Sequence, residues 1–192
     1  MTTWGAESDY KHFLPRICEL IAFADPGSGL HERTNWKLDM VRSYEWSEVE
    51  EQATHGYFVA LWDYTLLKLP QDISDEPVSD IVDCLNSLVI LGFDLPELLD
   101  LWLERAESSL APALRIAELA ISTHSLTVTT AQREQIASWL LGDRVRSLLD
   151  RHRVQSAEVN EEYADYISYS MAQLDKWRDE RPQEGHHSGV VT

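Results

Sequence analysis

The chain has 192 residues, a length that fits one domain and can bury a core without disulfides or metals. Its 33 acidic residues outnumber 16 lysines and arginines, and the net charge of −17 repels nucleic-acid phosphates and anionic lipid. The charge therefore argues against binding to nucleic acid or to a membrane surface, and it favours a basic protein as partner.

Neither the N-terminus nor the cysteines point to an exported protein. Residues 1–9 lack the basic and apolar regions of a signal peptide, and no run of about 18 uncharged apolar residues follows. Cys18 and Cys84 are far apart and lie among apolar residues, which is typical of buried thiols rather than of a disulfide. We expect a cytoplasmic protein without a membrane span.

Residues typical of helix starts and helix ends recur along the whole chain. A first helix is expected after Pro15, since apolar residues at helical spacing follow it and end at a turn over residues 25–29. A short second helix is expected between Trp36 and Tyr44. The only stretch of strand-like composition, residues 125–129, is short enough to be a linker.

Ser47 and Glu50 have the spacing of a capping box and predict a helix that can run to about Lys68. This helix is apolar on two sides, because Phe58 and Trp62 are offset from its main stripe. Such a helix is either sandwiched in the core or presents one side to a partner, and central burial is the preferred interpretation. The stripe expected to face the core consists of Val49, Ala53, Tyr57, Ala60, Leu61 and Tyr64.

The rest of the chain contains the same kinds of helix-start and helix-end signals. Gly92 is expected to be a glycine C-cap with Phe93 as the trailing apolar contact, and Pro182 is expected to end the last helix. Asp94 and Glu97 have capping-box spacing. The predicted starts of the later helices are Pro77, Asp94, Ser109, Thr129, Asp143 and Ser156.

Together these signals predict an all-α fold of about eight helices, either an irregular helical bundle or a short stack of antiparallel helix pairs. Residues 1–181 are expected to form one domain, followed by a flexible C-terminal tail at residues 182–192. No fixed repeat period is evident, and a regular solenoid stays an alternative to the bundle.

The acidic residues are concentrated in one part of the chain. Residues 41–104 contain 14 acidic residues and only two basic ones, Arg42 and Lys68. The preference of carboxylates for helix N-termini explains some of them, but it does not explain the missing cations. We call residues 41–104 the acidic block and interpret it as a surface that faces a basic partner.

The candidate partner-binding residues combine carboxylates with aromatic anchors, as protein interfaces often do. Four arginines downstream, Arg144, Arg146, Arg151 and Arg153, are too few to bind nucleic acid against the field of the whole protein. We expect them to pair with the acidic block, within the chain or across a homodimer. The candidate partner-binding residues are Asp72, Asp75, Glu76, Asp80, Asp83, Trp46 and Trp62.

Glu48, Glu51 and His55 are the alternative candidate site, because their spacing places them on about the same side of one helix. Carboxylates and imidazole bind zinc or iron, but a di-iron bundle requires two Glu-x-x-His motifs and further glutamates. The chain has no such motif pair, so a metal site is the weaker interpretation.

No nucleophile motif and no glycine-rich phosphate loop is present, and no cofactor is expected. The leading hypothesis is a non-catalytic, acidic protein-binding module, specifically an immunity protein or antitoxin that blocks a basic, nuclease-like toxin. The alternatives are a metal-binding helical bundle enzyme and a helical scaffold or assembly subunit.

Overall fold

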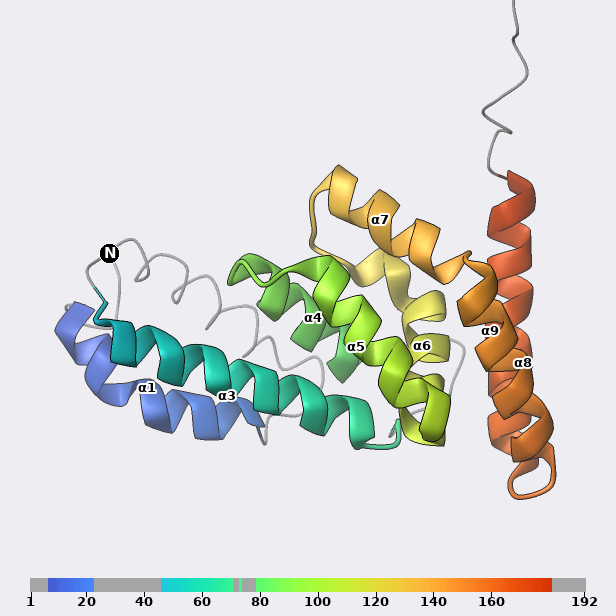
Figure 1. The fold of residues 1–192 in the computed structure, drawn as a ribbon, viewed down its shortest axis with the longest axis horizontal. Coiled ribbons are helices and arrows are strands. Elements are labelled where there is room, and N and C mark those ends of the chain that lie inside the picture. The colour runs from blue at the N-terminus through green and yellow to red at the C-terminus, as the bar shows by residue number, and fades with distance from the viewer. Residues whose placement is uncertain (1–6, 23–45, 71–72, 74–78, 181–192) are drawn as a thin grey trace, which may run out of the picture.

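The computed structural model describes residues 7–22, 46–70, 73 and 79–180, which fold into helices, and the helices within residues 79–180 are joined by short connections (Figure 1). These ranges contain eight α-helices, one 3₁₀ turn and no β-strand, so the predicted all-α class is confirmed. None of the described helices is long and apolar enough to cross a lipid bilayer. The helices are α1 (Glu7–Ala22), α3 (Glu48–Leu67), α4 (Asp80–Ile90), α5 (Leu95–Ser108), α6 (Leu110–Ser122), η1 (Thr123–Ser125), α7 (Thr130–Leu140), α8 (Asp143–Ala157) and α9 (Glu161–Glu180).

Several predicted features lie outside the described residues: the helix between Trp36 and Tyr44, the turn at 25–29, the helix start at Pro77 and the tail at 182–192. The described part of α4 begins at Asp80. Its N-cap is Ser79, whose hydroxyl accepts a hydrogen bond from the backbone N–H of Val82 at 3.2 Å.

The predicted capping boxes form at two helix starts, and at a third the predicted box is reduced to a simple N-cap. Ser47 and Glu50 form a reciprocal capping box at α3, and Thr129 forms one with Gln132 at α7. The backbone and side-chain hydrogen bonds from Ser47 hold the pKa of Glu50 below its usual value. Asp94 caps α5 by accepting from the N–H of Glu97 at 3.0 Å.

Two predicted helix starts were wrong. Pro15 lies inside α1 with its ring exposed, not at the start of the helix. Ser156 belongs to the last turn of α8, and its carbonyl accepts from the N–H groups of Val159 and Asn160 at 2.9 and 2.7 Å. These bonds close α8, so the last helix begins only at Glu161 and Val159 is 84% exposed.

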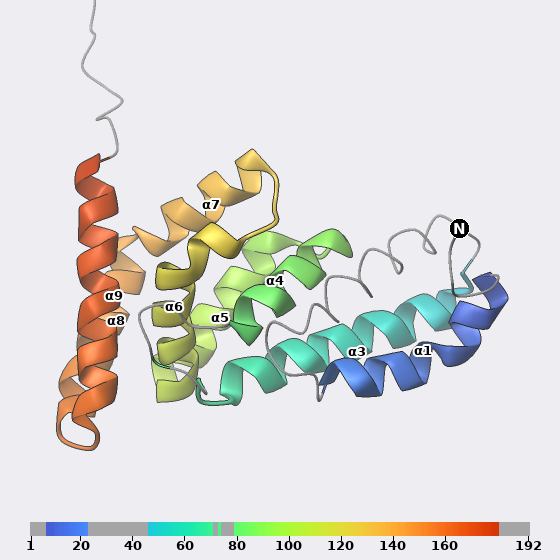
Figure 2. The same ribbon diagram turned by 180° about the vertical axis from the view of Figure 1, so that it is seen from behind.

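Helix α6 is the centre of the fold. All ten residues from 111 to 120 are buried, and α6 packs against α3, α4, α5, α8 and α9. Figure 2 shows α6 between α5 and the α8–α9 hairpin, with the α1–α3 pair at the opposite end of the molecule. The central helix is therefore α6 and not α3, because α6 is buried on every side whereas α3 has one exposed side.

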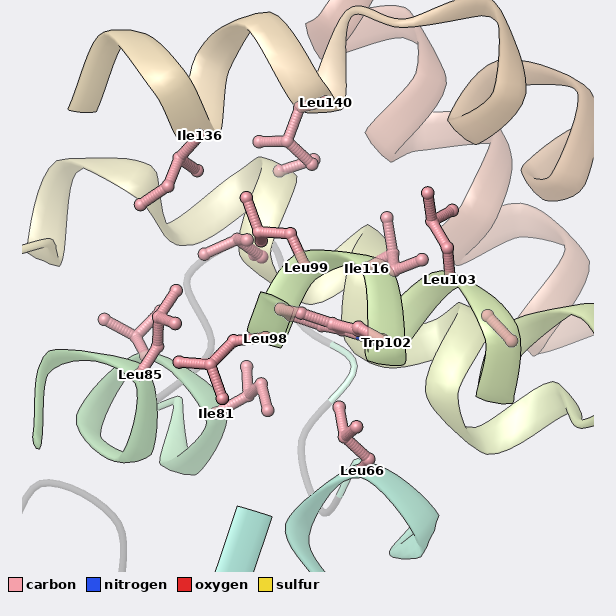
Figure 3. Close-up of a cluster of buried hydrophobic side chains, with 14 of the residues drawn as sticks. Leu66, Ile81, Leu85, Leu98, Leu99, Trp102, Leu103, Ile116, Ile136 and Leu140 are labelled. Atoms are coloured by element: carbon pink, nitrogen blue, oxygen red, sulfur yellow. The ribbon is translucent and has the colours of Figure 1, made fainter. Parts of the chain in front are cut away.

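The core is continuous across seven of the described helices, from α3 to α9. Figure 3 shows side chains from α3, α4, α5, α6 and α7 pointing toward one another, with Trp102 of α5 in the middle of the group. Trp102 is fully buried, and its indole N–H donates to the carbonyl of Pro112 at 2.9 Å. The labelled members are Leu66, Ile81, Leu85, Leu98, Leu99, Trp102, Leu103, Ile116, Ile136 and Leu140.

The side of α3 that faces the core overlaps the predicted one only in part. Val49 is 74% exposed and Tyr64 54% exposed, and Ala53 and Ala60 are exposed as well. Tyr57 faces α1, where its hydroxyl donates to the carbonyl of Cys18 at 2.5 Å. Of the predicted stripe only Leu61 is buried, and the core residues of α3 are Phe58, Leu61, Trp62, Thr65 and Leu66.

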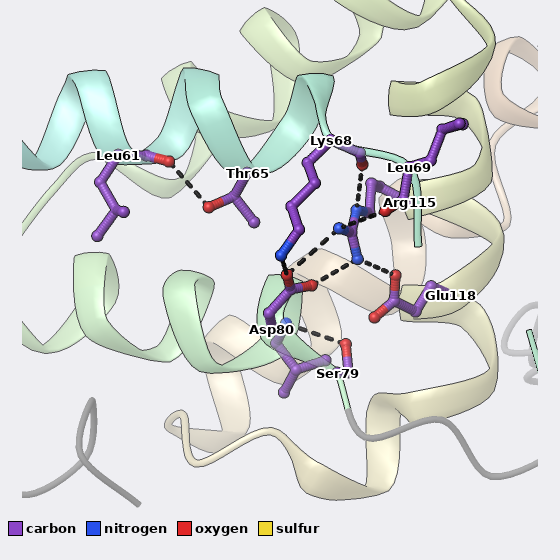
Figure 4. Close-up of polar contacts among 9 residues, drawn as sticks. Leu61, Thr65, Lys68, Leu69, Ser79, Asp80, Arg115 and Glu118 are labelled. Atoms are coloured by element: carbon purple, nitrogen blue, oxygen red, sulfur yellow. Dashed lines mark hydrogen bonds and ion pairs between the residues drawn. The ribbon is translucent and has the colours of Figure 1, made fainter. Parts of the chain in front are cut away.

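A buried ion network fixes α3 and α4 against α6. Arg115 of α6 is only 1% exposed, and it donates to the carbonyls of Lys68 and Leu69 at 2.9 and 3.3 Å. The same guanidinium contacts both oxygens of Asp80, at 2.5 and 3.3 Å, and contacts Glu118 at 2.6 Å (Figure 4). These five bonds match the five N–H donors of a guanidinium, which explains how the charge is tolerated in the core.

We expect Arg115→Met to lower the free energy of unfolding by about 3–5 kcal/mol, because it leaves Glu118 as a buried charge without its partner. The matched control is Arg16→Met, which breaks an ion pair between side chains that are 68% and 60% exposed. That change is expected to alter stability by less than about 1 kcal/mol. Urea unfolding followed by circular dichroism measures both variants. A structural role for the network is wrong if the two variants lose the same stability.

Burial raises the pKa of Glu118 above its usual 4.5, although the charge of Arg115 and a hydrogen bond with Ser79 act in the opposite direction. Between the pKa of Glu118 in the unfolded chain and its higher pKa in the native state, the native state holds more protons than the unfolded state. The free energy of unfolding therefore falls as the pH rises through this range. Glu118→Gln removes this loss. The stability of the variant relative to wild type should therefore increase from about pH 4.5 upward. Urea unfolding of both proteins across a pH series tests this prediction. A difference in the free energy of unfolding that does not change with pH would contradict it.

Candidate functional site

The predicted acidic site at the start of α4 is largely unsupported by the described structure. Asp72, Asp75 and Glu76 lie outside the described residues. Asp80 is held inside the protein by Arg115 and by Lys68, whose ammonium is 3.5 Å away, and its side chain is only 18% exposed. Asp83 is half-buried. Asp80 is thus a structural residue rather than a contact for a partner.

The two predicted aromatic anchors lie in different environments. Trp62 is fully buried, with its ring edge-on to Trp102 at 5.1 Å between centroids, so its assignment as a partner anchor was wrong. Trp46 lines a cleft at the start of α3, and the ammonium of Lys11 lies 5.1 Å from the centre of its ring. Only Trp46 is placed where a partner can reach it.

The predicted metal-binding residues do not converge. Glu48 accepts a hydrogen bond from the side chain of Gln52 at 3.1 Å, and His55 stacks on Phe93 instead of turning toward the two glutamates. Within the described ranges no three side chains of His, Cys, Asp or Glu come together in a group able to hold a metal ion. The geometry gives no support to a metal centre at Glu48, Glu51 and His55.

The structure reveals a different acidic surface, on α5. Glu97, Asp100 and Glu104 are exposed and are three or four residues apart, so they project from one side of the helix. None of them forms an ion pair with another described residue; Arg144 acts on Asp100 and Glu104 only at longer range. We call these three residues together with Asp94 the acidic ridge.

An aromatic cleft adjoins the acidic ridge. A hollow of about 370 Å³ is bordered by the first half of α3 and by the α4–α5 turn, and a second of about 260 Å³ continues it along α5. His55, Leu91 and Phe93 line both hollows, which we treat as one ring cleft. Its other described wall residues include Trp46 and Glu51 at one end and Asp94 and Glu97 of the acidic ridge at the other.

The α4–α5 turn places Phe93 in the ring cleft. Gly92 adopts a positive φ of 81°, and the N–H of Phe93 returns to the carbonyl of Leu88 at 3.0 Å. This is the predicted glycine C-cap, in the form of a Schellman motif. His55 of α3 stacks on Phe93 with 4.5 Å between ring centroids and 14° between planes, so the stack joins α3 to the turn.

The basic cluster on α8 pairs with carboxylates outside the acidic block, so the predicted pairing within the chain was wrong. Arg144 contacts Glu107 at 2.6 Å, Arg153 contacts Asp150 at 2.7 Å, and Arg146 pairs with Asp175. The arginines of α8 therefore do not neutralise the carboxylates of the acidic ridge through ion pairs. The cations that do meet the block come from elsewhere, such as Arg105, which binds Asp63 of α3 through two bonds of 3.2 Å.

Sequence reasoning missed both the acidic ridge and the ring cleft. A signal for the ridge was present, because Glu97, Asp100 and Glu104 alternate at helical spacing with the apolar residues of α5. The cleft had no such signal, since His55 and Phe93 are 38 positions apart in the chain and meet only through the packing of α3 on the turn.

No protein-family model, curated protein or solved structure matches this chain. Its function has therefore to be argued from the ridge and the cleft themselves.

A pair of glycine variants tests the geometry of the cleft wall. Gly92→Ala should destabilise the protein by about 1–2 kcal/mol, because a side chain is strained at positive φ. Gly56→Ala should stabilise it by roughly 0.5–1 kcal/mol, because a Cβ there meets no atom within 4 Å and alanine favours the helix. Thermal and urea unfolding of both variants measure the effects. Shifts of the same sign would contradict this description of the turn.

Proposed function

We propose that this protein is a non-catalytic, acidic binding module that occupies the basic surface of a partner protein, in the manner of an immunity protein or antitoxin. The observation that carries the proposal is the acidic ridge. Its carboxylates are exposed, lie on one side of α5 and are unpaired with the described residues, next to a cleft lined with aromatic rings.

Charge supports a basic partner. The protein carries a net charge of −17, and the ridge lies in a block with almost no lysine or arginine. A surface of one sign raises the rate at which an oppositely charged protein finds it, by about ten- to a thousandfold. Aromatic groups beside such a surface supply the apolar contact that a steered encounter needs in order to become a stable complex.

An inhibitor of a nuclease-like toxin is the specific form of the proposal. An enzyme site that holds nucleic-acid phosphates is electropositive, so an acidic helix can fill it and exclude the substrate. The partner-binding surface proposed now is the acidic ridge with Trp46 at the far end of the cleft, in place of the residues around Asp80.

Charge reversal of the ridge tests this function. The triple variant Glu97→Lys, Asp100→Lys and Glu104→Lys should slow association with a basic partner by about tenfold or more, because the steering field is reversed. The control variant Glu158→Lys, Asp165→Lys and Asp179→Lys changes the net charge equally at exposed positions of α9 and the turn before it. Circular dichroism and unfolding confirm that both variants remain folded.

The measurement is affinity capture from the native host at about 0.15 M and about 1 M salt, where the Debye length falls from about 8 Å to 3 Å. A basic protein retained by wild type and control but lost by the ridge variant is then expressed in a test host. Its toxicity should be relieved by wild type and control only. Equal retention by both variants, or a partner that is not toxic, would contradict the inhibitor function.

A further inference from the structure

The ring cleft has a composition that suits one kind of side chain. Its two hollows, of about 370 and 260 Å³, are each large enough to admit a side chain of a partner protein. The stacked rings of His55 and Phe93 form the wall that the two hollows share. Carboxylates lie on both sides of this wall.

The carboxylates of the cleft are available for a ligand. Glu51 and Glu97 are exposed and make no side-chain hydrogen bond or ion pair to the rest of the described protein. Neither lysine nor arginine is among the described residues that line the two hollows. A group that enters the cleft thus meets aromatic rings and negative charge, without a competing cation from the described wall.

The chain already contains this combination at the edge of the cleft. The ammonium of Lys11 lies 5.1 Å from the centre of the Trp46 ring and 3.6 Å from a carboxylate oxygen of Glu50. A cation between a ring and a carboxylate is therefore compatible with this environment. The ring cleft offers the same two partners, a ring and a carboxylate, at a place that an external group can enter.

We infer that the ring cleft binds an arginine side chain of the partner, with the guanidinium over the His55–Phe93 stack and against Glu51 or Glu97. A guanidinium is planar and weakly hydrated, so it stacks on aromatic rings while its N–H groups bind carboxylates in pairs. An ammonium can lie over a ring, as Lys11 does over Trp46, but it is a strongly hydrated point charge that has neither a planar face to stack nor the paired N–H groups that bind a carboxylate through two parallel bonds. The inference rests on the proposed function, since the arginine is part of the basic partner.

The test uses three probes of one size class: N-acetyl-arginine amide, its neutral isostere N-acetyl-citrulline amide, and N-acetyl-lysine amide. Each is titrated into the full chain, and NMR follows the ring signals of His55 and Phe93 and the indole N–H of Trp46. The arginine probe should shift these signals saturably and bind about tenfold or more tightly than either other probe.

Two variants locate the binding. The double variant Glu51→Gln and His55→Ala, both at exposed positions, should lose the arginine-induced shift of Trp46 while its circular dichroism stays unchanged. His124→Ala is the matched control, at an exposed histidine of η1, and should keep the shift. The inference is overturned if citrulline or lysine binds as tightly as arginine, if no signal moves, or if the double variant binds like wild type.

The outcome is separable from that of the proposed function. If the arginine probe fails but the ridge variant still loses its basic partner, then the proposed function stands and only the arginine site is wrong. If the probe binds as expected but no basic partner depends on the acidic ridge, then the cleft binds arginine in some context other than an inhibitor of a basic toxin.

Discussion

The position of Arg115 in the middle of an apolar helix is the constraint on which the rest of the structure depends. A buried guanidinium is tolerated only when its donors are all bonded, and here they reach the end of α3 and the start of α4. Replacing such a network by apolar groups is often neutral or favourable for stability. Its value in this fold is that it fixes the direction in which α3 leaves the core, and so the place where α3 meets the α4–α5 turn.

Helix α5 has two roles because its two sides differ in composition. The inner side supplies Trp102 to the core, whereas the outer side carries the acidic ridge. The Schellman turn before α5 directs Phe93 outward onto His55. Core packing, turn chemistry and surface charge therefore meet at one end of α5, where a change in any of them alters the ring cleft and the ridge together.

The distribution of charge shows why an acidic segment in the sequence differs from an acidic surface. Asp80 belongs to the acidic block, yet its carboxylate is neutralised by Arg115, a residue 35 positions away. Asp63 is likewise paired with Arg105. Among the carboxylates of α5, Glu97, Asp100 and Glu104 keep their field, because Arg144 of α8 is already paired with Glu107 of α5 and Arg146 with Asp175 of α9.

The sequence alone determined the features that depend on neighbours in the chain: the all-α class, the capping boxes at Ser47 and Thr129, and the glycine turn at Gly92. These follow from hydrogen bonds and backbone sterics within a few residues. Only the tertiary structure decided that α6 is the central helix, that Trp62 is buried, and that His55 lies against Phe93. The periodicity of α3 marked two apolar sides but not which of them would be covered, because that depends on the direction of α3 relative to α4 and α6, which contacts between residues distant in the chain determine.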